Sequence, residues 1–179
     1  MSDNIYLGNP NLKKANTPVE FTKEQIKEFI KCKQDPVYFA ETYVKIVSLD
    51  EGLVPFSMYK FQKKLIRNFH NHRFNICKMP RQTGKSTTCV SFLLHYAVFN
   101  DNVNIGILAN KAATARELLG RLQTAYENLP KWMQQGILSW NKGSMELENG
   151  SKILAASTSA SAVRGMSFNI LFLDEFAFV

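Results

Sequence analysis

The apolar pattern near the start of the chain has the period of helices. FTKEQIKEFIKCK, residues 21–33, carries an apolar stripe that begins with a Thr-x-x-Gln capping box. Asp35 and Pro36 then form a second helix start, because a capping side chain is followed by proline at the first helical position. We therefore predict short helices within residues 21–55. Residues 1–20 contain many turn formers and little periodicity, so we expect a flexible N-terminal arm there.

After these helices, helical stretches alternate with short apolar runs. YKFQKKLIRNFHNH, residues 59–72, has helical spacing, whereas RFNICKM, residues 73–79, is a short run that predicts a buried strand. An apolar helix, a second buried strand over residues 102–109 and a long amphipathic helix over residues 111–129 follow. This order predicts an α/β fold with a parallel sheet and helices on both faces, preceded by the short N-terminal helices.

The last part of the chain holds further strand signals. SMELENGSKILAAS has two extended runs around the Asn-Gly pair at 149–150, a hairpin signal because both central residues of such a turn need a positive φ angle. NILFLDEFAFV, residues 169–179, starts as an apolar strand and continues into Asp174 and Glu175. A chain that stops just after a buried strand leaves the neighbours of that strand unaccounted for. We therefore expect residues 56–179 to be a core that is truncated after this strand.

The composition fits one globular domain. With 179 residues, of which 45% are hydrophobic, the chain can bury a core but is too short for two domains of ordinary size. It contains neither a long uninterrupted apolar run nor an apolar N-terminal signal, so we expect a cytosolic protein without a membrane span. The three cysteines and three histidines have no metal-site spacing, and we interpret the cysteines as reduced packing residues.

The charge of the chain is strongly positive. A formal charge of +7 and an isoelectric point near 9.3 favour polyanionic partners, although solubility alone can account for such a value. Basic and aromatic residues alternate over residues 59–74, which is typical of a DNA surface. Phe61, Leu65 and Phe69 are nevertheless at core spacing. We therefore predict that they are buried and that the lysines between them form the solvated face of a helix.

KMPRQTGKSTT, residues 78–88, has the form of a phosphate-binding loop between a strand and a helix. The β- and γ-phosphates of a nucleotide need backbone N–H donors, a cation and a hydroxyl on Mg²⁺. Gly84 lets the backbone approach and Lys85 supplies the cation, while the hydroxyl of the next residue or of the one after it can bind Mg²⁺. The candidate nucleotide-binding residues here are Gln82, Thr83, Gly84, Lys85, Ser86 and Thr87.

The loop departs from the pattern G-x-x-x-x-G-K-[ST] at its start. Met79 stands where the first glycine is expected, and Pro80 and Arg81 follow. A guanidinium inside the loop could reach the γ-phosphate and stabilise transition-state charge, an effect worth about 10³- to 10⁵-fold in rate. The alternative is an arginine that simply lies on the surface.

Asp174 and Glu175 supply a second part of the same site. Both follow the apolar run ILFL, and the ends of parallel strands meet at one edge of a sheet. Asp174 can then hold Mg²⁺ through water, and Glu175 can polarise the attacking water. A solvated turn after a core strand is the alternative interpretation.

PRQTGKSTT, with its internal arginine, and LFLDEFAF together resemble the ATPase motor of the large terminase subunit of tailed bacteriophages, nearest the T-even type. The resemblance also takes in residues 104–122, 129–151 and 161–169. It implies a P-loop NTPase of the ASCE/RecA-like kind, with Walker A and Walker B motifs, that uses ATP and Mg²⁺. By this resemblance Arg81 is the in-loop arginine, and Lys85 and Ser86 are the phosphate and magnesium residues. Asp174 is then the magnesium-site acid and Glu175 the catalytic base.

The resemblance implies roles for two further residues. Gln62 lies where the family and related helicase-like motors place a glutamine that reads the adenine edge, and an amide can both donate to N7 and accept from the exocyclic amine. The alternative is an exposed helix glutamine. Arg164 lies where an arginine can point at the phosphates of a neighbouring subunit, the alternative being a structural or DNA-facing arginine.

The resemblance also implies a biological setting. The expected partners are double-stranded viral DNA, the portal protein and the small terminase subunit, in a homo-oligomeric ring on the procapsid within the host cytoplasm. Family members continue into a coupling motif and a nuclease domain, and we expect no nuclease activity from residues 1–179. The alternatives are a helicase-like DNA translocase of the same sheet class and a non-catalytic DNA-binding or assembly module.

Overall fold

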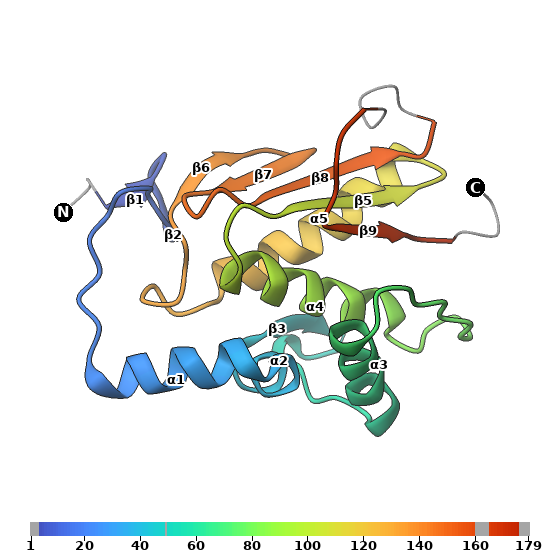
Figure 1. The fold of residues 1–179 in the computed structure, drawn as a ribbon, viewed down its shortest axis with the longest axis horizontal. Helices are drawn as coiled ribbons and strands as arrows, with labels where there is room; N and C mark the ends of the chain where they lie inside the picture. Colours follow the sequence, from blue (N-terminus) through green and yellow to red (C-terminus); the bar gives the residue numbers. More distant parts are fainter. Residues whose placement is uncertain (1–3, 49, 160–164, 176–179) are drawn as a thin grey trace.

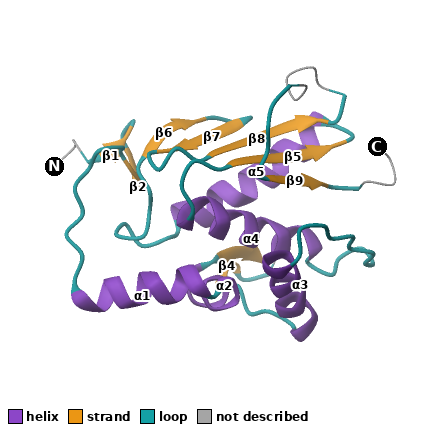
Figure 2. Ribbon diagram, in the orientation of Figure 1, coloured by secondary structure: helices purple, strands orange, loops and turns teal. Residues whose placement is uncertain are grey.

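The computed structural model describes residues 4–48, 50–159 and 165–175, and these form a layered α/β structure (Figures 1 and 2). The helices are α1 (Lys23–Gln34), α2 (Pro36–Tyr43), α3 (Lys60–Asn71), α4 (Lys85–Phe99) and α5 (Ala112–Glu127). The strands are β1 (Ile5–Tyr6), β2 (Asn9–Lys13), β3 (Lys45–Ser48), β4 (Gly52–Pro55), β5 (Asn104–Ala109), β6 (Ile137–Trp140), β7 (Ser144–Leu147), β8 (Lys152–Ser157) and β9 (Ile170–Leu173). Within the described residues, every helix falls short of the length and hydropathy that a bilayer span requires.

The main sheet is mixed rather than all-parallel. Its five strands lie in the order β6-β7-β8-β5-β9, with β8, β5 and β9 parallel and with β6 and β7 antiparallel to their neighbours. The hairpin expected at 149–150 is confirmed, since β7 pairs with β8 across it. Of its two central residues, only Gly150 has a positive φ angle. The Asn149 side chain instead donates to the carbonyl groups of Ala97 and Asn100 at 2.9 and 3.0 Å, which joins this turn to the end of α4.

Helix α4 lies at the centre of the layers. It packs on α5, which covers β5 and β8, and its other side meets α2 and α3 (Figure 1). Eleven of its fifteen residues are buried, as expected for a helix that is apolar all round. Helix α5 is the helix that packs on β5 and β8, and α4 packs on α5. Helices on both faces of the sheet are therefore not confirmed for the described residues.

The segment after α3 differs from its prediction. Residues 73–79 form no strand, and Phe74 and Ile76 are 84% and 99% exposed. A short apolar run becomes a strand only when a neighbouring strand offers hydrogen-bond partners. In the described part of the chain the sheet ends at β9, which pairs only with β5. The expected parallel strand before the phosphate loop is therefore wrong for this structure.

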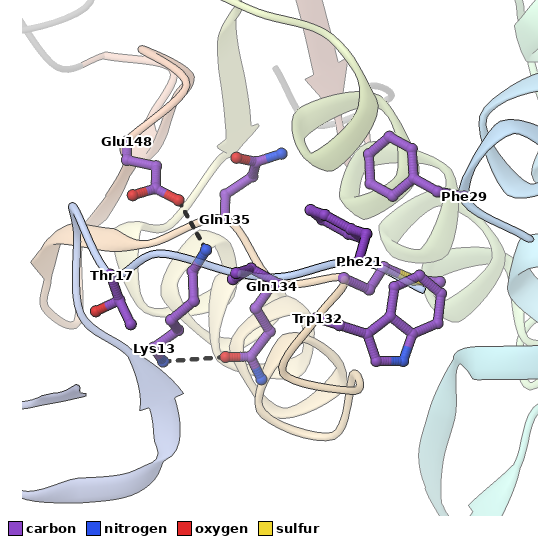
Figure 3. Close-up of a pocket in the computed structure, with 10 residues that line it drawn as sticks. Lys13, Thr17, Phe21, Phe29, Trp132, Gln134, Gln135 and Glu148 are labelled. Atoms are coloured by element: carbon purple, nitrogen blue, oxygen red, sulfur yellow. Dashed lines mark hydrogen bonds and ion pairs between the residues drawn. The ribbon is translucent and has the colours of Figure 1, made fainter. Parts of the chain in front are cut away.

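The N-terminal residues also differ from their prediction. In place of an irregular arm, β1 and β2 form a hairpin in which Leu12 is 1% exposed. Lys13 extends toward Glu148, with Nζ 2.9 Å from Oε1, and its backbone nitrogen donates to Gln134 (Figure 3). These partners lie more than 120 positions away in the sequence, so no local pattern could indicate the contacts.

The two N-terminal helices agree with the sequence analysis. Thr22 and Gln25 form the predicted capping box of α1. The Asp35 side chain accepts hydrogen bonds from the backbone nitrogens of Val37 and Tyr38, which caps α2. After α2 the chain turns into the antiparallel pair of β3 and β4 rather than continuing as a helix.

His95 on α4 predicts that the stability depends on pH. Its ring is 3% exposed, Nε2–H donates to the Cys32 carbonyl at 2.9 Å, and Nδ1 has no partner among the described residues. Burial lowers the pKa of His95 to about 4. The unfolded chain therefore binds one more proton between about pH 6.5 and pH 4, and the free energy of unfolding should fall by about 2 kcal/mol between pH 7 and pH 5.

Urea unfolding at a series of pH values measures this loss. The variant His95→Gln, which can keep the hydrogen bond to Cys32, should show a smaller decrease below pH 6.5. The exposed His72 provides a matched control, and His72→Asn should keep the wild-type profile. Equal profiles for the wild type and His95→Gln would contradict the assignment.

Candidate functional site

The loop before α4 is held in a left-handed backbone conformation at two positions. Gln82 has φ +61° and Gly84 has φ +71°, and Gly84 is the N-cap of α4. A non-glycine residue in this region costs of order 1 kcal/mol and persists where the surroundings hold it. The Thr83 hydroxyl donates to the Pro80 carbonyl at 3.0 Å and closes the turn. No side chain caps α4, so the N–H groups of its first turn are available to an anion.

Gln62 of α3 supports this loop from below. It is 4% exposed, its Oε1 accepts from the Tyr59 backbone nitrogen at 2.9 Å, and its Nε2 donates to the Thr83 carbonyl at 3.2 Å. The alternative of an exposed helix glutamine is therefore wrong. A Cβ atom on Gly84 would lie 2.6 Å from Nε2, so glycine is needed there both for its φ angle and for this close approach.

The loop and the end of β9 come together as predicted from the sequence. Lys85 Nζ lies 4.0 Å from Asp174 Oδ1, although the residues are 89 positions apart. This distance is too long for a direct hydrogen bond. Asp174 is 6% exposed, and Oδ1 has no hydrogen-bond partner among the residues that the structure describes. A buried carboxylate oxygen without a partner is suited to binding a cation, so Asp174 fits the predicted role of a magnesium-site acid.

Other predicted residues are only partly placed. Glu175 is exposed and has φ +52°, a left-handed conformation next to Asp174. Ser86 and Thr87 are half-buried in the first turn of α4. Arg81 is exposed in the loop, which is compatible with both of its interpretations. Arg164 lies outside the described residues.

Thr88 is a third hydroxyl residue after the phosphate loop, following Ser86 and Thr87. Thr88 is fully buried, and its Oγ1 donates to the Gly84 carbonyl at 2.9 Å. This side chain therefore stabilises the first turn of α4. The choice of a hydroxyl for Mg²⁺ stays between Ser86 and Thr87.

The thiols beside the loop agree with the prediction of reduced packing residues. Burial raises the pKa of Cys89 to about 12. Burial also raises the pKa of Cys77, while nearby Lys85 opposes the shift. Both shifts favour the protonated thiol, so neither sulfur is predisposed to act as a thiolate nucleophile.

The contact between Gln62 and Thr83 is the part of the site that sequence reasoning missed. The two residues are 21 positions apart in different elements. The only local signal is the glutamine itself, whose amide suits recognition of adenine equally well. The hollow of Figure 3 is lined by none of the loop residues or strand-end acids.

Two comparisons relate this chain to known proteins. The family described as "Terminase large subunit, T4likevirus-type, N-terminal" matches residues 76–179. The crystal structure of the HK97 bacteriophage large terminase is similar with a TM-score of 0.64 and 19% sequence identity. The match covers 79% of this chain and 30% of the HK97 chain, so this chain spans less than a third of that protein. At this identity the likeness shows the fold alone.

The close approach at Gly84 predicts the effect of adding a methyl group. Gly84→Ala should lower the free energy of unfolding by about 2 kcal/mol, partly from the strain of a positive φ angle and partly from displacing the Gln62 amide. Urea unfolding of the purified chain measures the change.

Gly52 is a matched control for the strain alone. Its φ is +72°, and a methyl group added there would meet no atom within 4 Å, so Gly52→Ala should cost only about 1 kcal/mol. In a Gln62→Ala background the cost of Gly84→Ala should fall to that of Gly52→Ala. If the cost does not depend on the residue at position 62, the contact does not contribute.

Proposed function

Because this chain belongs to the family of T4-type large terminase subunits and matches their N-terminal part, we propose that it binds and hydrolyses ATP to drive DNA packaging. Membership of the family is consistent with a role in DNA packaging. The observation that carries the ATPase proposal is the position of Lys85, at the start of α4 and 4.0 Å from the buried carboxylate of Asp174. A cation, a helix N-terminus and a buried acid therefore lie close together.

The residues of the loop would divide the binding of the triphosphate among them. Backbone N–H groups of the loop and of the first turn of α4 donate to phosphate oxygens, and Lys85 neutralises the β- and γ-phosphates. Ser86 or Thr87, together with Asp174, would hold Mg²⁺ directly or through water. The ion would supply neutralisation of the charge that develops on the phosphates.

The hydrolytic step would use the residues at the rim of the site. Glu175 would accept a proton from the water whose oxygen bonds to the γ-phosphorus, while the bond from that phosphorus to the β–γ bridging oxygen breaks and ADP leaves. Arg81 donates to the γ-phosphate oxygens as negative charge develops on them. Its exposure leaves it able to act on its own nucleotide or on that of a neighbouring copy.

The setting of this activity is also a proposal. The chain would act on double-stranded viral DNA with the portal protein and the small terminase subunit, as part of a homo-oligomeric ring on the procapsid in the host cytoplasm. These partners follow from the family rather than from a contact in the structure.

The first test separates nucleotide binding from hydrolysis. Lys85→Ala should weaken binding of both ATP and inorganic tripolyphosphate by about 10- to 100-fold, because a charge-assisted contact to the phosphates is lost. Glu175→Gln should keep the dissociation constant for ATP within about threefold and lower turnover by about 10²- to 10⁴-fold. Isothermal titration and a phosphate-release assay measure the two effects.

Lys111 is an exposed lysine and serves as the matched control. Lys111→Ala should change neither binding nor turnover. If the Lys85→Ala variant binds ATP as tightly as the wild type does, the motor proposal fails.

The second test concerns the role of Gln62. Both of its amide atoms already bind backbone groups, so we predict that it positions the phosphate loop rather than reading the base. Gln62→Ala should therefore weaken the binding of ATP, GTP and tripolyphosphate to a similar extent, by about 3- to 10-fold. The exposed Gln34 is a control, and Gln34→Ala should bind all three ligands as the wild type does.

An adenine-reading role gives a different result. If Gln62 read the adenine base, Gln62→Ala would weaken the binding of ATP alone. The affinity for tripolyphosphate would stay unchanged, because tripolyphosphate has no base. That outcome would contradict the positioning role.

A further inference from the structure

The net positive charge of this chain comes from one stretch. Residues 52–100 contain eight lysines and arginines and no aspartate or glutamate, and they lie between Glu51 and Asp101. The rest of the chain holds 14 basic and 15 acidic residues and is nearly neutral. Within this stretch α4 contributes only Lys85, so the other cations lie on α3 and on the segment that joins α3 to α4.

Three of these cations form a stripe on α3. Lys60, Lys64 and Arg67 follow the spacing i, i+4, i+7, which places them on one face, and all three are exposed. No ion-pair partner for them occurs in the described ranges 4–48, 50–159 and 165–175. Lys63 differs, because its Nζ lies 2.7 Å from Glu41 of α2. Helix α3 lies at the outside of the layers, beside the segment that leads to α4 (Figure 1).

Two exposed aromatic residues flank Lys60 in the sequence. Tyr59 is 70% exposed and Phe61 is 44% exposed, and their rings stack with centroids 5.7 Å apart and an interplanar angle of 8°. The prediction that Phe61 belongs to the core is therefore wrong. The buried side of α3 is formed by Gln62 and Ile66 instead. Solvation of the lysines on this helix does not account for two exposed aromatic rings beside Lys60.

We propose that this face of α3, defined by Lys60, Lys64 and Arg67, binds the phosphate backbone of DNA. The stripe spans about 10 Å along the helix, over which one strand of a duplex presents about three phosphates. Acidic residues are absent from these 49 positions, and Glu41 of α2 beside α3 is paired with Lys63, so a polyanion would meet less repulsion at this face. Lysine is depleted in the cores of protein interfaces, so the composition fits nucleic acid better than a protein partner. The proposal rests on the proposed function only in taking the polyanion to be DNA.

Two variants with the same change of charge test this surface. The first replaces Lys60, Lys64 and Arg67 with Gln, and the second replaces Lys23, Lys27 and Lys33 of α1, which are equally exposed. Binding of a 30-base-pair duplex is measured by fluorescence anisotropy at several salt concentrations. The α3 variant should bind at least about tenfold more weakly, and the slope of log K against log salt should decrease in magnitude by about 2 to 3. The α1 variant should keep a slope close to that of the wild type.

The outcomes distinguish this proposal from the ATPase proposal. Equal losses in the two variants would show an effect of net charge alone and would overturn the assignment, as would a wild type that binds ATP but not DNA. If the α3 variant instead changes the oligomeric state of the protein and leaves DNA affinity intact, the face is a protein interface and the proposal fails. Loss of DNA binding in the α3 variant alone, with wild-type thermal unfolding and tripolyphosphate binding, supports it even if Lys85→Ala has no effect on ATP.

Discussion

The burial of α4 on every side is the constraint on which the phosphate loop depends. One side of the helix packs on α5 beneath the sheet, and the other packs on α2 and α3. Because Gly84 caps α4 and Lys85 begins it, the packing of α4 in the core fixes where the loop ends. The register of β9 on β5, where Leu173 pairs with Leu108, places Asp174 at the corresponding edge. The candidate site therefore lies where the buried helix α4 begins and the edge strand β9 ends.

Features that depend on neighbours in sequence could be predicted from the sequence. The capping box of α1, the Asp35 cap of α2 and the hairpin at 149–150 each need only residues within a few positions of one another. The strand expected over residues 73–79 needed a partner edge, which no local pattern specifies. The β1–β2 hairpin is likewise held by Gln134 and Glu148, which no pattern within residues 1–20 could indicate.

The candidate site shows the same division. The approach of Lys85 and Asp174 was predictable, because strand ends and helix starts meet at one edge of an α/β sheet. The rotation of α3 about its axis could not be predicted from the sequence. Apolar spacing placed Phe61 inside, but the contacts of Phe69 with Phe92 of α4 and of Gln62 with Thr83 turn Phe61 and Tyr59 outward. A helix with apolar residues on more than one face has several possible orientations, and its neighbours choose among them.

The hydrogen bond from Gln62 to Thr83 connects α3 to the loop before α4 through a single side chain. Lys60, Lys64 and Arg67 lie on α3 within five positions of Gln62, and the Thr83 carbonyl belongs to the loop that leads into α4. A shift of α3 would thus alter the geometry of the loop, and ordering of the loop would restrain α3. Thermodynamic linkage requires that such an influence be equal in both directions. If a ligand bound to α3 changes the affinity of the loop for its own ligand by some factor, the ligand of the loop must change the affinity of α3 by the same factor.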